Sequence, residues 1–232
     1  MKNMLNKGAC SERGLHMDID VRNTVVVFDQ LNKNDLKFDK LRSLIDGEIP
    51  ESTFLPDPLS PTVINYKRAK LTISFVPTFI PTTALSMDTK LQMQVNVTAP
   101  ENTTAARKFP NIIKQILESL PEHQSIIAFG FNFNCTIKNS PQKVHTIMSL
   151  PAYLPENSEF KFVPETFIKL SFDKNETKYY LDIQDNQDNV LIHVNVHHEI
   201  VMHLNELVNQ VSNHYSSALD NSKQLISEVT KT

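Results

Sequence analysis

The sequence predicts an α+β protein with antiparallel β-sheets, helices packed on one face, and a long C-terminal helix. Apolar and polar residues alternate along most of the predicted strands, which is typical of strands with one buried face. The strands follow one another in groups instead of alternating singly with helices, and this order favours antiparallel pairing. Residues 201–229 hold an apolar repeat of three and four residues, with no glycine or proline inside it.

The composition is that of an ordinary globular protein. The 232 residues, 40% of them hydrophobic, are enough for one sizeable core. A net charge of -3 does not point to nucleic acid or an anionic membrane as a partner. No apolar run approaches the roughly 18 residues that a membrane span needs.

The expected domain organisation follows from where polar and proline-rich stretches lie. Residues 1–17 are polar, without the apolar centre of a signal peptide, so we expect a disordered tail and a cytoplasmic protein. Residues 18–232 then form a single α+β domain. An alternative division gives two β-rich halves, 18–138 and 165–232, joined by a proline-rich connection.

The first half of the chain predicts four strands and two helices. The strands are expected at residues 18–28, 62–77, 85–97 and 127–137. The helices are expected from the cap at Asn34-Asp35 to Gly47, and over residues 103–120, where Pro110 moves the effective start to Lys108 or Phe109. Residues 49–61 carry four prolines and predict a loop, and residues 78–80 between Pro77 and Pro81 predict an edge or a bulge. Gly130, on the polar face of its strand, indicates a bulge or a close neighbour.

The second half predicts a meander followed by the long helix. A second proline-rich connection at 140–164 is expected to hold a short helix or turn near residues 144–150. Three antiparallel strands are expected at residues 167–172, 178–184 and 189–197, separated by turn-like Asp and Asn clusters.

The apolar stripe of the terminal helix has two interpretations. It packs along the protein's own sheet, or it pairs with a copy of itself or another chain as a coiled coil. A helix of about 30 residues is about 45 Å long, longer than one small sheet is wide. We therefore expect its first half to dock internally and its second half to be mobile or to bind another chain, either a copy of this protein or another protein partner. The candidate interface residues are Val208, Val211, Tyr215, Ala218, Leu225 and Val229.

Histidines gather between residues 193 and 203 and raise the question of a metal site. His193 and His197 share a strand face but lie about 13 Å apart, too far to hold one ion. A site made of His197, His198 and His203 with Glu199 requires a bend where the strand meets the helix. The alternative is a set of solvated imidazoles, which could make an interface sensitive to pH.

Other catalytic signatures are missing from the sequence. Four glycines form neither a dinucleotide-binding fingerprint nor a phosphate-binding loop, and no G-x-S-x-G motif occurs. Cys10 and Cys135 are too far apart in sequence to suggest a zinc motif. Cys135 faces the same side as three phenylalanines and is expected to be an inert core thiol. We expect no cofactor.

Three hypotheses for function follow. The leading one is a non-enzymatic protein-binding or assembly protein that oligomerises through its C-terminal helix. The layout of strands, helix, aromatic strand, proline-rich connection, strands and long helix resembles a bacterial group that is related in topology to the SecB export chaperone. This resemblance implies a chaperone that binds unfolded or partner chains. The third hypothesis is a metal-dependent enzyme using the region from His193 to His203.

Overall fold

The structure, a computed structural model, describes residues 17–137 and 167–229, apart from residues 54, 56, 58, 84, 85, 102, 175, 176, 187 and 188. The strands are β1 (Met17–Phe28), β2 (Glu51–Thr53), β3 (Thr62–Tyr66), β4 (Leu71–Thr83), β5 (Ser86–Thr98), β6 (Ser125–Ile137), β7 (Phe167–Lys174), β8 (Thr177–Asn186), β9 (Asn189–His198) and β10 (Met202–His203). The helices are the 3-10 turn η1 (Lys33–Asp35), α1 (Phe38–Arg42), α2 (Thr104–Arg107), α3 (Phe109–Glu118) and α5 (Leu204–Val229). The predicted α+β fold class is confirmed.

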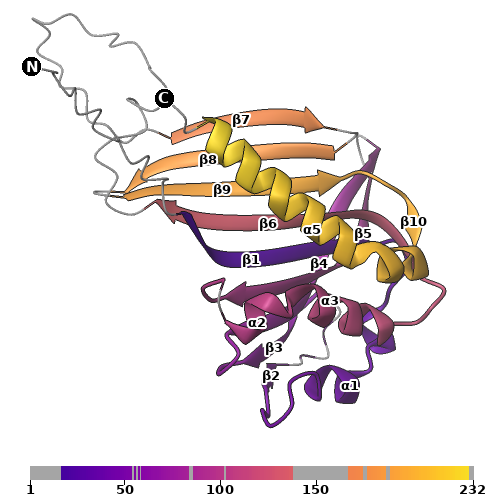
Figure 1. Ribbon diagram of the computed structural model, residues 1–232. Helices are drawn as coiled ribbons and strands as arrows, with labels where there is room; N and C mark the ends of the chain where they lie inside the picture. The colour runs from indigo at the N-terminus through magenta and orange to yellow at the C-terminus, as the bar shows by residue number, and fades with distance from the viewer. Residues whose placement is uncertain are drawn as a thin grey trace, which may run out of the picture.

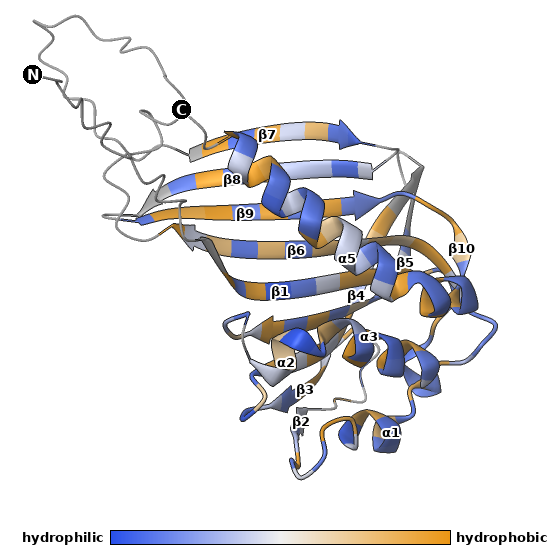
Figure 2. Ribbon diagram, in the orientation of Figure 1, coloured by the Kyte–Doolittle hydropathy of each residue, from blue (hydrophilic) through white to orange (hydrophobic). Residues whose placement is uncertain are grey.

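The ten strands form one antiparallel sheet in the order β2-β3-β4-β5-β1-β6-β9-β8-β7, with β10 paired to β6. Figure 1 shows α5 running diagonally across β6, β9 and β8 towards β7, while α1, α2 and α3 lie at the other end. Colours alternate along the strands in Figure 2, as expected for a sheet with one buried face.

The two halves of the sheet repeat one order of elements. Each half has a long strand, a long connection, a meander of three strands and a helix. The first meander is β3-β4-β5 and the second is β7-β8-β9. The long strands β1 and β6 pair in the middle, so the strand order reads the same outwards from this pair in both directions. The halves are therefore related by an approximate two-fold rotation. Only the first half adds an outer strand, β2, among the residues that the structure describes.

A row of asparagines crosses the centre of the face opposite the helices. Asn96, Asn23, Asn132 and Asn195 occupy adjacent register positions on β5, β1, β6 and β9, and all are half-buried. The Asn132 Nδ2 group donates to Asn23 Oδ1 at 3.0 Å across the central pair. Equivalent residues at equivalent places in the row agree with the two-fold relation.

Helix α5 docks on its own sheet along its whole length. Its buried residues are Leu204, Leu207, Val211, Tyr215, Ala218, Ser222 and Ile226. The Tyr215 ring centroid lies 5.5 Å from that of Phe109 on α3 and 5.6 Å from that of Phe131 on β6. The expectation that the second half of the helix extends beyond its own body is therefore wrong. Both halves of the chain share one sheet, and a helix of about 39 Å fits diagonally across it.

The buried track of α5 also departs from the predicted heptad repeat. Leu207 and Ile226 face the sheet, where the repeat had Val208 and Leu225. A straight helix has 3.6 residues per turn and drifts relative to a 3.5-residue repeat. The buried residues of α5 therefore have the spacing of a straight helix that lies on a sheet.

Several element boundaries differ from expectation. The single strand predicted at 62–77 is two strands, because the chain turns back at residues 67–70 and Lys70 adopts a left-handed φ of 51°. The predicted loop 49–61 contains the short β2. The predicted helix over 103–120 breaks at Lys108, and α3 starts at Phe109 as Pro110 indicated. The tail before residue 17 and the connection at 140–164 lie outside the described residues.

Candidate protein-binding surface

The outer edge of β7 has no neighbouring strand in the part of the chain that the structure describes. Its eight residues pair with β8 in an unbroken register from Phe167 to Lys174. Neither proline nor glycine interrupts its sequence FIKLSFDK. Other edges of the sheet are less suited to pairing. At the opposite edge β2 has three residues, and β4 carries Pro77 and Pro81 beyond the point where β3 ends.

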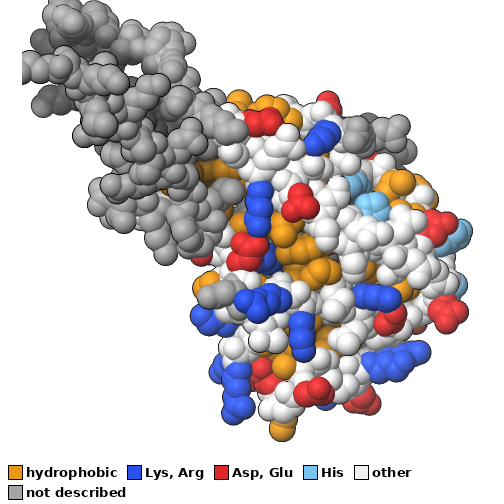
Figure 3. Space-filling model, viewed as in Figure 1, with side chains coloured by type: hydrophobic (Ala, Val, Ile, Leu, Met, Phe, Trp, Pro, Cys, Tyr) orange, Lys and Arg blue, Asp and Glu red, His pale blue; other side chains and the backbone are white. Residues whose placement is uncertain are grey.

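The apolar side chains of β7 are only partly covered. Ile168, Leu170 and Phe172 are half-buried and pack against the core, whereas Lys169, Ser171 and Asp173 are exposed. On the neighbouring β8, Leu181 and Ile183 are 0% and 1% exposed. Hydrophobic side chains accordingly reach the surface along the margin over β7 (Figure 3). A further strand would complete this cover. The outer backbone edge of residues 167–174, together with the side chains of Ile168, Leu170 and Phe172, is called the β7 edge surface below.

A groove of about 270 Å³ separates β7 and β8 from the end of α5. It is lined by Phe172, Asp173, Lys174, Tyr179, Asn221, Gln224, Leu225 and Glu228. The Lys174 Nζ group donates to Asn221 Oδ1 at 2.9 Å, and Asn221 Nδ2 donates to the Tyr179 hydroxyl at 2.9 Å. These bonds join α5 to β7 and β8 beside the groove.

A second hollow, of about 400 Å³, shares Lys174, Tyr179 and Asn221 with this groove. Two histidines line it: the His198 ring stacks on Phe129 with centroids 4.4 Å apart, and His214 lies 5.4 Å from His198. The buried His198 Nε2 atom has no hydrogen-bond partner within the described chain. Burial, followed by the neighbouring His214 and His197, lowers the pKa of His198 from 6.5 to about 4. Burial also lowers the pKa of His214.

The lowered pKa of His198 predicts an acid-sensitive contact between β9 and α5. The unfolded chain takes up this proton at the ordinary pKa, so the stabilisation is complete above about pH 6.5 and is lost as the pH falls towards 4. When the pH falls from 7.5 to about 5, we expect the titration of His198 to lower the free energy of unfolding by about 1 kcal/mol. This value allows for solvent screening of the partly buried ring. Urea unfolding at both pH values measures it. His198→Gln should shrink the difference, and the exposed His203→Gln should leave it in place. An unchanged difference in His198→Gln would contradict the assignment.

The structure separates the histidines proposed as metal ligands. His197 lies on the face opposite the helices, with its Nε2 atom 3.7 Å from Glu199 Oε1, whereas His198 stacks under α5 and His203 is exposed on β10. Among the described residues, no group of three or more His, Cys, Asp or Glu side chains lies close enough to hold an ion. The histidine that sequence reasoning did not connect with this region is His214, which α5 brings to His198 from sixteen residues further along.

The predicted interface residues of α5 lie on its inner side or its flanks. Val211, Tyr215 and Ala218 are buried within the chain, at 1%, 5% and 2% exposure. Val208, Leu225 and Val229 are half-buried and pack against the core. Leu225 is the member of this set that lines the groove beside β7.

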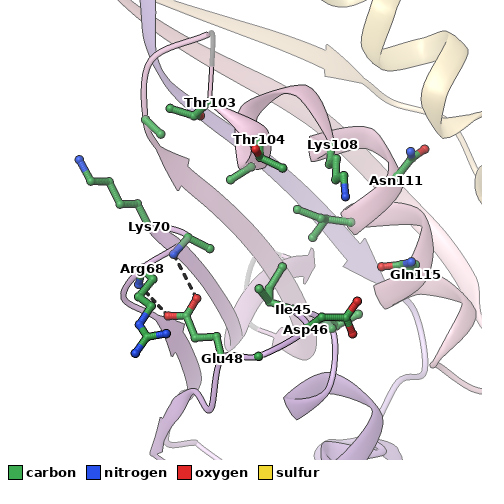
Figure 4. A pocket seen from close by; sticks show the side chains of 16 residues that line it. Ile45, Asp46, Glu48, Arg68, Lys70, Thr103, Thr104, Lys108, Asn111 and Gln115 are labelled. Atoms are coloured by element: carbon green, nitrogen blue, oxygen red, sulfur yellow. Dashed lines mark hydrogen bonds between the residues drawn. The ribbon is translucent and has the colours of Figure 1, made fainter.

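A third hollow, of about 730 Å³, lies between the β3–β4 turn and helices α2 and α3 (Figure 4). Its polar lining mixes Arg68, Lys70 and Lys108 with Asp46 and Glu48. The Glu48 carboxylate accepts the backbone N–H groups of Arg68 at 2.6 Å and of Ala69 at 3.2 Å, as Figure 4 shows. That carboxylate therefore supports the turn. No serine, cysteine or histidine lines this hollow, so its lining offers no pair of nucleophile and histidine base.

Two side chains with reactive or charged groups, Cys135 and Arg22, are buried in the core. Burial, with a smaller contribution from Asp20, raises the pKa of the Cys135 thiol to about 12, so this thiol is not a nucleophile. Arg22 is 1% exposed, and its Nη1 group donates to the carbonyls of Ile19 and Ala99 at 3.2 and 3.0 Å. The alternating pattern of β1 gave no sign that an inward position would hold a guanidinium.

None of the described helices is long and apolar enough to cross a membrane. Comparison of the chain with protein-family models, with curated proteins and with solved structures finds no match.

Proposed function

We propose that this protein is a non-enzymatic protein-binding protein that accepts an extended segment of a partner chain as an additional strand beside β7. The observation that carries the proposal is the β7 edge surface, a regular eight-residue edge whose apolar side chains are only half-buried. Strand addition gives a partner backbone hydrogen bonds along the edge and contacts for alternate side chains. The groove beside Leu225 adjoins the same edge.

The approximate two-fold rotation supports this proposal. In the first half, β2 pairs with β3 and covers its outer edge. The equivalent place in the second half is beside β7, where the described residues supply no strand. A partner strand at this place would extend the strand order equally far on both sides of the central pair β1 and β6.

Self-association, which the sequence led us to expect, would use the β7 edge surface and not the apolar stripe of α5. The buried stripe of α5 is occupied by its own sheet, so β7 and the half-buried Leu225 become the contact. A cytoplasmic location remains an expectation from the sequence.

A chaperone of the SecB type is the second candidate. The edge and the groove beside it would accept an unfolded chain, because backbone pairing does not depend on sequence. Fluorescence anisotropy with reduced, carboxymethylated α-lactalbumin distinguishes the two candidates. Binding of this unfolded protein, but not of folded α-lactalbumin, would favour the chaperone. If neither the unfolded nor the folded form of α-lactalbumin binds, the result would favour a protein that binds a dedicated partner.

Hydrogen exchange tests strand addition itself. The full chain is mixed with an excess of a synthetic peptide of alternating valine and threonine, flanked by lysines. We expect slower amide exchange in residues 167–174 and unchanged exchange in β2 and β3. A peptide of matched length with two central prolines is the control, because proline cannot donate to a ladder. At a concentration where the chain is monomeric, exchange in β7 that neither peptide alters, or that both alter equally, would contradict the proposal.

A further inference from the structure

We propose that the strand taken up at β7 is β7 of a second copy of this chain, paired antiparallel about a two-fold axis through Ser171. This inference rests on the proposed function and names its partner. It is carried by the charges on the exposed side of the strand, by the apolar row on the other side, and by the way the two halves of the chain already join.

Opposite charges flank Ser171 on the exposed face of β7. Lys169 lies two residues before it and Asp173 two residues after it. In an antiparallel pair centred on Ser171, Lys169 would lie directly opposite Asp173 of the second copy, and Asp173 opposite Lys169 of that copy. Each contact would therefore occur twice in the dimer.

The neighbouring strand extends this pattern. Lys169 pairs with Asp182 on β8, with its Nζ atom 4.0 Å from Asp182 Oδ2, and Asp173 pairs with Lys178. Across the interface, the four neighbouring strands would present Asp182 on β8 and Lys169 on β7 of one copy. These are followed by Asp173 on β7 and Lys178 on β8 of the second copy. The signs alternate without interruption, and opposite charges on facing strands stabilise the pairing.

The charges also select one register. A shift of two residues removes both contacts between Lys169 and Asp173. A shift of four residues places Lys169 opposite Lys169, or Asp173 opposite Asp173, depending on its direction. A shift of an odd number would turn the apolar side chains to the wrong face. The register centred on Ser171 is the one that satisfies all these conditions.

The same register matches the apolar row beneath the helices. Leu170 would lie opposite Phe172 of the second copy, and Phe172 opposite Leu170. Both side chains are half-buried in the single chain and would be covered in the dimer. Leu225 lines the groove on this face, next to Phe172, so α5 would border the joint.

The centre of the molecule already uses this mode of association. The strands β1 and β6 pair antiparallel about an approximate two-fold axis and join the two meanders into one sheet. Pairing of β7 with β7 of a second copy would repeat that arrangement at the outer edge of the described sheet, with a true two-fold axis, and would close the assembly as a dimer.

Charge reversal in the full chain tests the proposal by sedimentation equilibrium. Lys169→Asp places acidic residues opposite one another at both ends of the joint, and Asp173→Lys places lysines there. We expect each variant to dimerise about tenfold more weakly than the unaltered chain. An equimolar mixture of the two should form a heterodimer as tightly as the unaltered chain pairs with itself, because the opposite charges meet again. The double variant Lys169→Asp/Asp173→Lys should also recover.

Two controls guard this test. Lys114→Asp makes the same charge change on α3, at an exposed side chain away from β7, and should leave dimerisation unchanged. Thermal unfolding of each variant shows whether it still folds, because Lys169 and Asp173 also face charges on β8. A monomeric unaltered chain, single variants that dimerise normally, or a mixture no tighter than its components would overturn the second copy as the partner. The peptide experiment on Lys169→Asp, at a concentration where this variant is monomeric, then tests strand addition separately from self-association.

Discussion

Replacing Tyr215 with alanine is expected to lower the free energy of unfolding by about 3–5 kcal/mol. The side chain is 5% exposed, and its ring meets Phe109 of α3 together with Phe131 and Phe133 of β6, with centroids 5.5 to 5.8 Å apart. Truncation would leave a cavity where α5, α3 and the sheet come together. Urea unfolding followed by circular dichroism measures the loss.

Two variants serve as controls for this prediction. Tyr215→Phe keeps the ring and loses the hydroxyl that Arg22 contacts, so we expect a cost of about 1 kcal/mol. Asn209→Ala removes an exposed side chain of the same helix and should be nearly neutral. A loss below about 1 kcal/mol for Tyr215→Ala would contradict the docking of α5 on its own sheet.

Gly130→Ala is expected to cost about 3 kcal/mol. A Cβ atom at this position would lie 2.7 Å from the backbone oxygen of Val196 on the paired strand β9. The obstacle is main chain in the middle of a ten-stranded sheet and cannot rotate away, so the strands would have to move apart. Thermal and urea unfolding would both report the change.

Thr136→Ala is the matched control, because Thr136 is a half-buried position on the same strand and face as Gly130. It should change stability by less than about 1 kcal/mol. Full stability of Gly130→Ala would mean that β6 and β9 do not approach as closely as the structure has them.

Alternation and proline placement were enough to predict most of the fold. The apolar-polar pattern of β6 and β9 located both strands, and Pro110 located the start of α3. The close neighbour expected at Gly130 is confirmed as the Val196 carbonyl. The division of 62–77 into β3 and β4 was missed, because both strands are rich in β-branched residues and a turn without glycine or proline gives little local signal.

The binding surface could be predicted only in part. The sequence located β7 as a strand, but the edge position of a strand depends on the sheet order, which local patterns do not contain. The stripe on α5 was visible as well. Its partner was not, because an apolar stripe fits a sheet of the same chain as readily as a second helix. The approach of His214 to His198 likewise required knowledge of how α5 crosses β9.

Amide hydrogen exchange of the full chain at a low and a high protein concentration tests the central claim most directly. If the protein pairs through β7 while α5 stays docked on its own sheet, raising the concentration should slow exchange in residues 167–174. Residues 211–226 should then be equally protected at both concentrations. Protection that rises with concentration in residues 211–226, while residues 167–174 exchange at an unchanged rate, would contradict the account.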